Sequence, residues 1–408
     1  MSNTILTPTT VTREVGRILH NNLRFCRNIN RQYDNSHKST GQRDGGSIKL
    51  RLPNQYTTST GAALSIQDTT EGSVTLTRGT QRHVDTNFTT DELTQSLDDF
   101  SMRILEPSIS TLASVIDYDA MSMVTDIGNS VGTPGTTPAT ALVALQANAK
   151  MSDFATPVSQ RYIGLDPAAN AAMVNGLSGF FNSSDKISSQ YKTGVMGMNT
   201  LGYDEWYMSQ SIRKHTTGSG AASTVLIDEP SGTLLVEGMT TVDMDISGGA
   251  SETITQGDVF TVAGVYAVNP ETKQSTGSLL QLTCTALSTA SSGQFTAVAF
   301  SPALYSSASD GLQNVDALPI NNAAVTILGG VSTTYPQNIA YHRDAFVLGT
   351  ADLEMPQGVH FSAREVQDDI SIRCVRQYRI GTDDIPCRFD VLYGYVVWRK
   401  ELACRIWG

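Results

Sequence analysis

Residues 222–331 lack any helical periodicity, and this block constrains the fold more than any other feature of the sequence. It is rich in Thr, Ser, Val, Gly and Ala, and short strand patterns recur at spacings of roughly 8 to 12 residues. One of them, GDVFTVAGVYAVNPETKQSTG at residues 257–277, alternates like a strand and then enters a polar loop. A block of this length and pattern predicts a small β-barrel or sandwich.

The sequence on either side of this block mixes helix and strand patterns. TALVALQANAKM reads as a helix, RYIGL as a strand, and Asp166 and Pro167 as the N-cap and first turn of a further helix. After residue 335 the segments DAFVLGTADLEMP, ISIRCVRQYRI and FDVLYGYVVW read as strands. The β-rich unit is therefore expected to interrupt an α/β domain.

The N-terminal segment predicts a basic amphipathic helix. Apolar residues recur from Val11 to Tyr33 at steps of three and four, Thr12 is placed as its N-cap, and arginines occupy the other face. Residues 1–51 hold nine basic and three acidic groups, a net of +6, whereas the whole chain carries −11 and the remainder therefore −17. Such a helix packs on its own core, docks on an acidic partner, or lies on a membrane.

A long hairpin follows. Ile48, Leu50 and Leu52 alternate with Lys49 and Arg51, and a second alternating run starts at Val74 and continues through Val84 to Phe88. The sequence between these runs is polar and rich in Gly and Thr. Too few apolar residues are present to cover a core, so the hairpin needs another surface to lie on.

The sequence after the hairpin predicts a long kinked helix. Thr89 and Glu92 have capping-box spacing, and the apolar stripe that follows resumes beyond Pro107 as far as Ile127. Proline inside a helix kinks or interrupts it, so Pro107 is the expected kink. The helix is expected to end before the Gly- and Pro-rich loop GNSVGTPGTTPAT.

Composition and motifs exclude several functions. No apolar run is long enough to span a membrane and no signal peptide is recognisable, so folding in a cytoplasm is expected. The five cysteines have no CxxC spacing and no nearby His, which predicts buried free thiols, with no metal and no cofactor. The acidic charge disfavours a general nucleic-acid binder, and none of the GxSxG, HExxH, P-loop or GxGxxG motifs is present. Asp243 and Asp245 resemble the start of a calcium loop, but Ile254 stands where a Glu ligand is needed, which leaves an acidic turn.

In the order of its elements, the chain resembles the major coat protein family of short-tailed double-stranded DNA phages of the Salmonella phage P22 type. The matching segments are ILTPTTVTREVGRILHNNL, IKLRLPNQYTTSTGAALSIQD, QYKTGVMGMNTLGYDEWY, GDVFTVAGVYAVNPETKQSTG, DAFVLGTADLEMPQGV and PCRFDVLYGYVVWRKELACRI. They span nearly the whole chain.

The resemblance implies an α+β, Hong Kong 97-like capsid fold with an inserted all-β barrel, and no enzymatic activity. The expected segments are an N-terminal arm (1–36), an extended loop (37–88), the spine helix and peripheral domain (89–135), the first part of the axial domain (136–222), the inserted barrel (223–331), and a return through both domains (332–408).

The resemblance also implies the partners. The subunit is expected to assemble with itself as pentamers and hexamers around a scaffolding protein, with a portal protein, a decoration protein and packaged double-stranded DNA bound without sequence specificity. The shell belongs to the virion and is assembled in the bacterial host cytoplasm. Candidate scaffold contacts are Arg13, Arg17, Arg24, Arg27 and Arg31, and candidate contacts between subunits are Lys49, Arg51, Asp243 and Asp245. Two other classes stay open from the residues alone, a virion-associated β-barrel binding or decoration protein and a hydrolase with dispersed catalytic residues.

Overall fold

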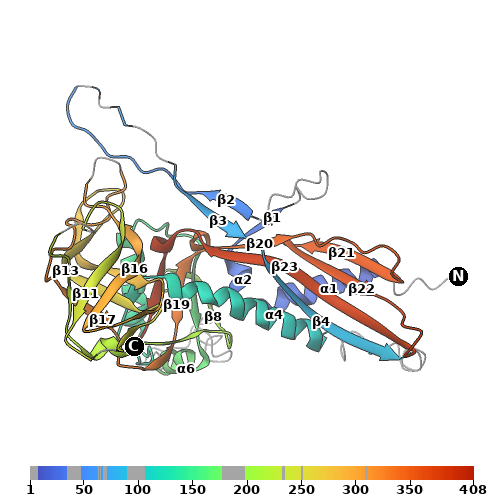
Figure 1. Cartoon of the computed structure of the whole chain (residues 1–408). Coiled ribbons are helices and arrows are strands. Elements are labelled where there is room, and N and C mark those ends of the chain that lie inside the picture. The colour runs from blue at the N-terminus through green and yellow to red at the C-terminus, as the bar shows by residue number, and fades with distance from the viewer. Residues whose placement is uncertain are drawn as a thin grey trace. The chain divides into compact units, whose positions relative to one another are not determined.

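The computed structural model divides into two units. It describes residues 8–34, 47–62, 64, 66–67, 71–89, 106–176, 198–231, 235–249, 251–307 and 311–408. The first unit comprises Met1–Leu50, Ser73–Met121 and Phe346–Trp398, and the second comprises Arg51–Gly72, Ser122–Ala345 and Arg399–Gly408. Figure 1 labels the principal elements along the chain.

The first unit is built on a long twisted sheet whose central strand is β23 (Asp384–Val397). Ile385, Phe389 and Val391 alternate along β23 as buried side chains, which is the pattern of a strand packed on one face. The other strands follow in the order β1 (Asn30–Asp34), β20 (Phe346–Ala351), β23, β22 (Ile370–Arg376) and β21 (Phe361–Gln367), with β4 (Thr80–Thr89) also paired to β23 (Figure 1). The strands predicted after residue 335 therefore form this sheet.

Helix α4 (Glu106–Ala120) packs in the first unit through one apolar stripe. Its buried residues include Ile109, Leu112, Ala113 and Ile116, at the spacing expected of an amphipathic helix. Pro107 lies in the first turn of the described helix, and the predicted kink there depends on what precedes Glu106. The predicted first half, residues 90–105, lies outside the described residues. A 3₁₀ helix, η3 (Met121–Asp126), follows α4.

The N-terminal segment is shorter as a helix than its periodicity predicted. Helix α1 (Pro8–Asn22) is followed by the single turn α2 (Phe25–Asn28) and by strand β1, which contains Tyr33. Thr12 is buried inside α1 and is not its N-cap. The apolar spacing continues past Asn22 because Leu23, Cys26 and Ile29 are buried in the same core, although the helix itself has ended.

The predicted hairpin pairs β2 (Ser47–Arg51) with β3 (Ser73–Thr77). Val84 and Phe88, which the sequence pattern assigned to the same hairpin, lie instead on β4 in the long sheet. This difference arises from long-range strand pairing, since Val84 of β4 pairs with Phe389 of β23 and Phe88 pairs with Ile385. Among the described residues, the hairpin pairing is thus limited to β2 and β3.

The second unit contains a mixed sheet covered by two helices. Helices α5 (Ala141–Asp153) and α6 (Pro167–Gly176) contribute Ala144, Ala147, Met151 and Met173 to the core that includes Trp206 of the sheet. Asp166 accepts hydrogen bonds from the backbone N–H groups of Ala168 and Ala169, so its predicted N-cap role is confirmed. The strand order is β5 (Ser130–Val131), β24 (Ala403–Ile406), β19 (Asn338–His342), β6 (Arg161–Leu165), β8 (Tyr203–Met208) and β7 (Met198–Thr200).

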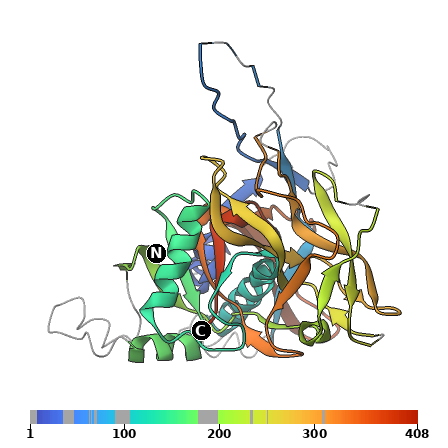
Figure 2. The same cartoon turned by 90° about the vertical axis from the view of Figure 1, so that its left-hand side faces the viewer.

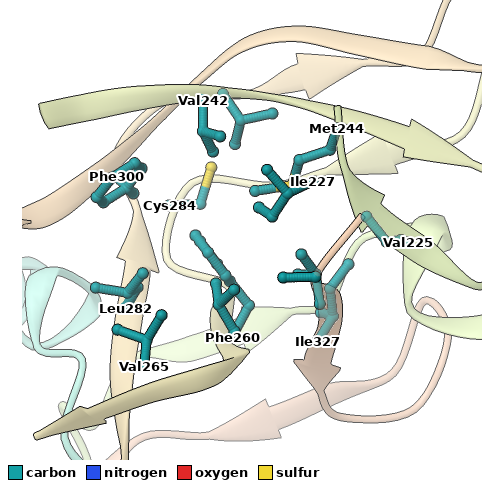
Figure 3. Packing of buried hydrophobic residues seen from close by; sticks show 14 of the residues in the cluster. Val225, Ile227, Val242, Met244, Phe260, Val265, Leu282, Cys284, Phe300 and Ile327 are labelled. Carbon is teal, nitrogen blue, oxygen red and sulfur yellow. The ribbon is translucent and has the colours of Figure 1, made fainter. Parts of the chain in front are cut away.

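An all-antiparallel closed barrel occupies the β-rich block, as predicted. Its strands run in spatial order β10 (Val225–Ile227), β11 (Met239–Ile246), β16 (Gln294–Leu304), β14 (Ser275–Cys284), β13 (Val259–Val268) and β17 (Ala324–Leu328), and β17 pairs back to β10. In the view of Figure 2 these strands, coloured yellow-green to orange, face the viewer. Phe260, Phe300, Leu282, Val242 and Ile327 point toward one another inside the barrel (Figure 3). The interior is therefore a packed core.

A two-stranded ribbon joins the barrel to the mixed sheet. The chain leaves through β9 (Lys214–Thr216) and returns through β18 (Thr334–Pro336), which pair antiparallel. Short elements complete this unit: η5 (Ser219–Ala222), the pair β12 (Thr253–Ile254) and β15 (Ser288–Thr289), η6 (Arg343–Ala345) and η7 (Lys400–Leu402). We call the β9–β18 ribbon the neck.

Candidate functional site

The loop between β2 and β3 is bridged by hydrogen bonds, and none of its described apolar side chains is buried. The amide side chain of Gln67 bonds both to the N–H and to the carbonyl of Thr57, and the N–H of Leu52 donates to Gly72 at 2.8 Å. Tyr56, Leu64 and Ile66 are 55%, 87% and 82% exposed. We call these three side chains the loop tip. Large apolar side chains that are exposed on a loop held by hydrogen bonds form a surface that is suited to burial against another molecule.

Of the two basic candidates on this hairpin, Arg51 has an acidic neighbour among the described residues. Lys49 is exposed on β2, whereas the Arg51 guanidinium lies 3.6 Å from the carboxylate of Glu71 across the hairpin. Both side chains of the Arg51 pair are largely exposed, so the pair adds less than about 1 kcal/mol. Either residue is accessible to a partner.

The five arginines predicted to bind a scaffold do not form one uniform surface. Arg13 lies 3.6 Å from Glu365 of β21, and Arg17 donates to Glu14 one turn earlier at 2.9 Å. That hydrogen bond lowers the pKa of Glu14. Arg24 and Arg27 are exposed on the α2 turn. Nε and Nη1 of Arg31, by contrast, are buried with no hydrogen-bond partner among the described residues.

A buried carboxylate on α4 anchors this N-terminal segment. Asp117 accepts the backbone N–H of Arg24 at 2.6 Å and that of Cys26 at 3.0 Å, which satisfies donors at the start of the α2 turn. Burial raises the pKa of Asp117, while the two backbone bonds oppose that shift. Two residues later, Asp119 accepts from Arg82 of β4 at 2.9 Å and from the hydroxyl of Tyr393 of β23 at 2.7 Å. The end of α4 thus holds both the N-terminal segment and the sheet.

The predicted acidic turn is a strand. Asp243 and Asp245 both lie on β11 of the barrel, so the expectation of an acidic loop there is corrected. Asp243 accepts the backbone N–H of Ala297 on the neighbouring strand at 2.6 Å, and Asp245 is exposed. Polar and apolar residues alternate along β11, and this alternation puts the two carboxylates two positions apart, as in a calcium loop. Among the described residues, no group of His, Cys, Asp and Glu side chains could hold a metal ion.

The polar loop NPETKQ closes the β13–β14 hairpin and is tied to its own subunit. Asn269 accepts the N–H groups of Glu271 and Thr272 through its side-chain oxygen and donates to the carbonyl of Asp153 at 2.6 Å. Lys273 donates to the carbonyl of Gly311, with Gln55 of the extended loop 3.5 Å away. This loop therefore packs the barrel against its surroundings and carries no catalytic arrangement.

A buried arginine joins the neck region to the barrel, and sequence reasoning missed it. Arg405 of β24 is fully buried, and its guanidinium donates to the carbonyls of Gly257 and Thr125 and to the side chain of Gln337. Burial lowers the pKa of Arg405 to about 10, so the side chain stays charged at neutral pH. Only its position in an apolar run, CRIW, could have indicated a buried charge.

Further buried contacts strengthen this attachment. The carboxylate of Asp258, at the start of β13, accepts from Gly218 and Thr255 and lies 2.8 Å from the His215 ring in the neck. Lys400 donates to the hydroxyl of Ser301 at 2.7 Å, and burial lowers its pKa. The barrel is thus bound to the mixed sheet by a polar, largely buried junction, which we call the barrel junction.

Comparison with models of protein families identifies the family of this chain. The family described as P22 coat protein, gene protein 5, matches residues 3–406. The chain is a member of the P22 coat protein family. Comparison with curated proteins finds no match.

Solved phage structures are similar to the coat protein at low identity. A chain of Mycobacterium phage Che8 is 12% identical, with 94% of this chain and 90% of that chain covered and a TM-score of 0.44. A chain from the capsid of Ralstonia phage GP4 is 6% identical, with coverages of 93% and 87% and a TM-score of 0.45. The CUS-3 coat protein I-domain is 28% identical over 26% of this chain and 96% of its own, with a TM-score of 0.20.

Family membership confirms the predicted fold class and function. The coat protein is a major capsid protein that assembles with copies of itself into an icosahedral shell and is part of the virion. It is a structural protein and not an enzyme, so the hydrolase interpretation falls. The alternative of a virion-associated β-barrel binding or decoration protein is also set aside, because the family match covers residues 3–406. No helix among the described residues is long and apolar enough to cross a bilayer.

Proposed function

We propose that the loop tip is a contact between subunits, where the extended loop of one coat protein lies on a neighbouring copy. The observation that carries this proposal is that Tyr56, Leu64 and Ile66 are exposed on a loop held in shape by the Thr57–Gln67 bonds. A loop fixed before binding loses little entropy when it docks, and burial of an apolar side chain contributes about 1.5–3 kcal/mol. Lys49 and Arg51 then meet carboxylates of the neighbour.

Charged substitutions at the loop tip test this proposal. Leu64→Asp with Ile66→Asp is expected to leave the urea unfolding of the subunit unchanged, because neither side chain is buried in it, and to abolish shells in sucrose gradients and negative-stain images. Thr60→Asp, a charged change at another exposed position of the same loop, is the control and is expected to give normal shells. Normal yields of shells from the double variant would refute the assigned contact.

We propose that the basic N-terminal segment binds an acidic scaffolding protein, with Arg24 and Arg27 as the principal contacts. Both are exposed on the α2 turn, whereas Arg13 and Arg17 already have acidic neighbours and Arg31 has buried guanidinium atoms. Exposed charge pairs weaken as salt rises. Binding of scaffolding protein is therefore expected to fall with salt, and Arg24→Glu with Arg27→Glu to weaken it more than Arg13→Glu. Equal weakening by both variants would oppose the ranking.

We propose that Asp245 contacts another subunit through the outer face of the barrel. Asp243 accepts a hydrogen bond from Ala297, so reversing its charge also disturbs the barrel. Asp245→Lys is the cleaner change, and it is expected to reduce shell formation while the barrel stays folded by circular dichroism. Normal assembly of that variant would remove Asp245 from the interface.

We also propose the remaining parts of the assembly. Pentamers and hexamers form around the scaffold in the host cytoplasm, a portal protein occupies one vertex, and a decoration protein binds outside. The first unit corresponds to the peripheral domain, and the mixed sheet to the axial domain. The net charge of −17 outside residues 1–51 keeps packaged DNA from adhering to the shell, because like charges repel. Retention of duplex DNA by purified empty shells at physiological salt would contradict this last point.

A further inference from the structure

Two of the five buried thiols are in contact. The Sγ atoms of Cys374 on β22 and Cys387 on β23 lie 3.6 Å apart, although thirteen positions separate them in the chain. The two residues are diagonal neighbours on adjacent antiparallel strands, because Cys374 pairs with Phe389 and Cys387 with Arg376. Both side chains face the same side of the sheet. A disulfide needs a separation of about 2.05 Å, so the sulfurs must approach by roughly 1.5 Å.

A positive charge stands beside this pair. Arg376 lies directly opposite Cys387, and its Nε atom is buried with no hydrogen-bond partner among the described residues. The hydrogen bond from the Cys374 thiol, together with the charge of Arg376, lowers the pKa of Cys387 against the effect of burial. A thiolate is the nucleophile in disulfide exchange, and a neighbouring cation favours it.

The other three cysteines have no such arrangement. Cys26, Cys284 and Cys404 are each buried and free, and the thiols of Cys284 and Cys404 donate to backbone carbonyls. Burial raises the pKa of Cys284 to about 11 and that of Cys404 to about 12. They serve as matched internal controls for the reactive pair.

We propose that Cys374 and Cys387 form a redox-sensitive modification site, a dithiol in reducing surroundings that closes to a disulfide once the coat protein meets an oxidant. The oxidant is a small-molecule disulfide such as oxidised glutathione. The Cys387 thiolate attacks one sulfur of that molecule, its S–S bond breaks, and one glutathione leaves as a thiolate. The Cys374 sulfur, as its proton passes to a glutathione thiolate, then attacks the Cys387 sulfur of the mixed disulfide and releases the second glutathione. The two cysteine protons pass to the two glutathione thiolates, so two thiols are oxidised while one disulfide is reduced.

The disulfide would join the strands at the base of the hairpin turn formed by residues 377–383. That turn is already ordered by the Arg379–Asp384 ion pair at 2.6 Å. A covalent link between β22 and β23 limits the unfolded chain and therefore stabilises the sheet. Because disulfides persist only in oxidising surroundings, the link would form in particles outside the reducing interior of a cell.

Thiol counting on the full-length protein tests the proposal. Native protein is equilibrated with oxidised glutathione, denatured, alkylated and digested with trypsin, which cuts after Arg376 and Arg379 and so separates the two cysteines. We expect a disulfide-linked peptide pair containing Cys374 and Cys387, full alkylation of the other three thiols, and an upward shift of the unfolding temperature that dithiothreitol reverses. Full alkylation of all five thiols in protein that is still folded would overturn the proposal.

Two variants test the order of the steps. Cys374→Ala removes the resolving thiol and is expected to retain glutathione on Cys387, whereas Cys387→Ala is expected to leave Cys374 unmodified. Arg376→Gln is expected to slow the modification of Cys387 severalfold. Equal glutathione incorporation at both positions would contradict the assigned nucleophile, and the wild-type thiol count decides the disulfide even if a variant fails to fold.

Discussion

Replacement of Arg405 by Met tests whether the barrel junction holds the inserted barrel on its own subunit. Arg405 is fully buried and donates to three acceptors, the carbonyls of Gly257 and Thr125 and the side chain of Gln337. Methionine has similar bulk but no donor, so all three acceptors lose their partner. Each unsatisfied buried acceptor costs about 1–3 kcal/mol, and removal of the buried charge offsets part of that sum. We expect a net loss of about 3–5 kcal/mol.

Urea unfolding of purified subunits measures this loss. Trp407 is buried and packs edge to face on Tyr335 of the neck, with ring centroids 5.6 Å apart, so tryptophan fluorescence reports on the junction. Arg399→Met is the matched control, because Arg399 pairs with Glu401 at 2.8 Å in a part-exposed position. A pair of that kind contributes about 0.2–1 kcal/mol. If Arg405→Met unfolds at the urea concentration of Arg399→Met or of wild type, the junction does not carry the stability assigned to it.

Three further changes have definite outcomes. Gly132→Ala is expected to cost at least about 1–3 kcal/mol in urea unfolding, because φ is +84° and the new Cβ would lie 2.3 Å from the carbonyl oxygen of Trp407; an unchanged midpoint would refute this. Pro107→Ala is expected to cost less than about 1 kcal/mol, since Pro107 lies in the first described turn of α4, and a larger loss would contradict this. Burial raises the pKa of Asp117 above its ordinary value of 3.8, so the folded protein binds this proton more tightly than the unfolded protein. The free energy of unfolding of wild type relative to Asp117→Asn is therefore expected to fall as pH rises from 3.8 through the folded pKa and then to level off. A difference that does not depend on pH would contradict this.

Local patterns were sufficient where an element is defined by its own residues. The N-cap at Asp166, the helix at α5 and the all-β character of residues 223–331 follow from capping chemistry and periodicity, which act over a few residues, whereas closure into a barrel rather than a sandwich does not. Strand β4, with the sequence TQRHVDTNFT, was assigned to the hairpin, whereas it pairs with β23, roughly 300 positions away. Tertiary pairing overrides a weak local pattern.

The contact residues that were predicted differ from the buried residues that were missed in what their own sequence segments show. Exposed charges such as Lys49, Arg24 and Asp245 are visible as charges in the sequence, yet nothing local shows which of them a partner covers. Arg405 and the Cys374–Cys387 pair depend on neighbours brought together by the fold. Sequence spacing therefore gave no signal for either.

The barrel junction bears on the role of the inserted barrel. The barrel has its own core, and it is also tied to the mixed sheet by Arg405, Lys400 and Asp258. These contacts stabilise the subunit that carries the barrel. Contacts with another subunit are proposed only for its exposed outer face, at Asp245.

Imaging of the purified coat protein tests whether it assembles into closed shells. The protein is produced alone and together with the proposed scaffolding protein, and the particles are examined by negative-stain and cryo-electron microscopy. The account predicts closed polyhedral shells, of uniform size when the scaffolding protein is present. Monomers or small oligomers alone, at high concentration and with the scaffolding protein present, would contradict it.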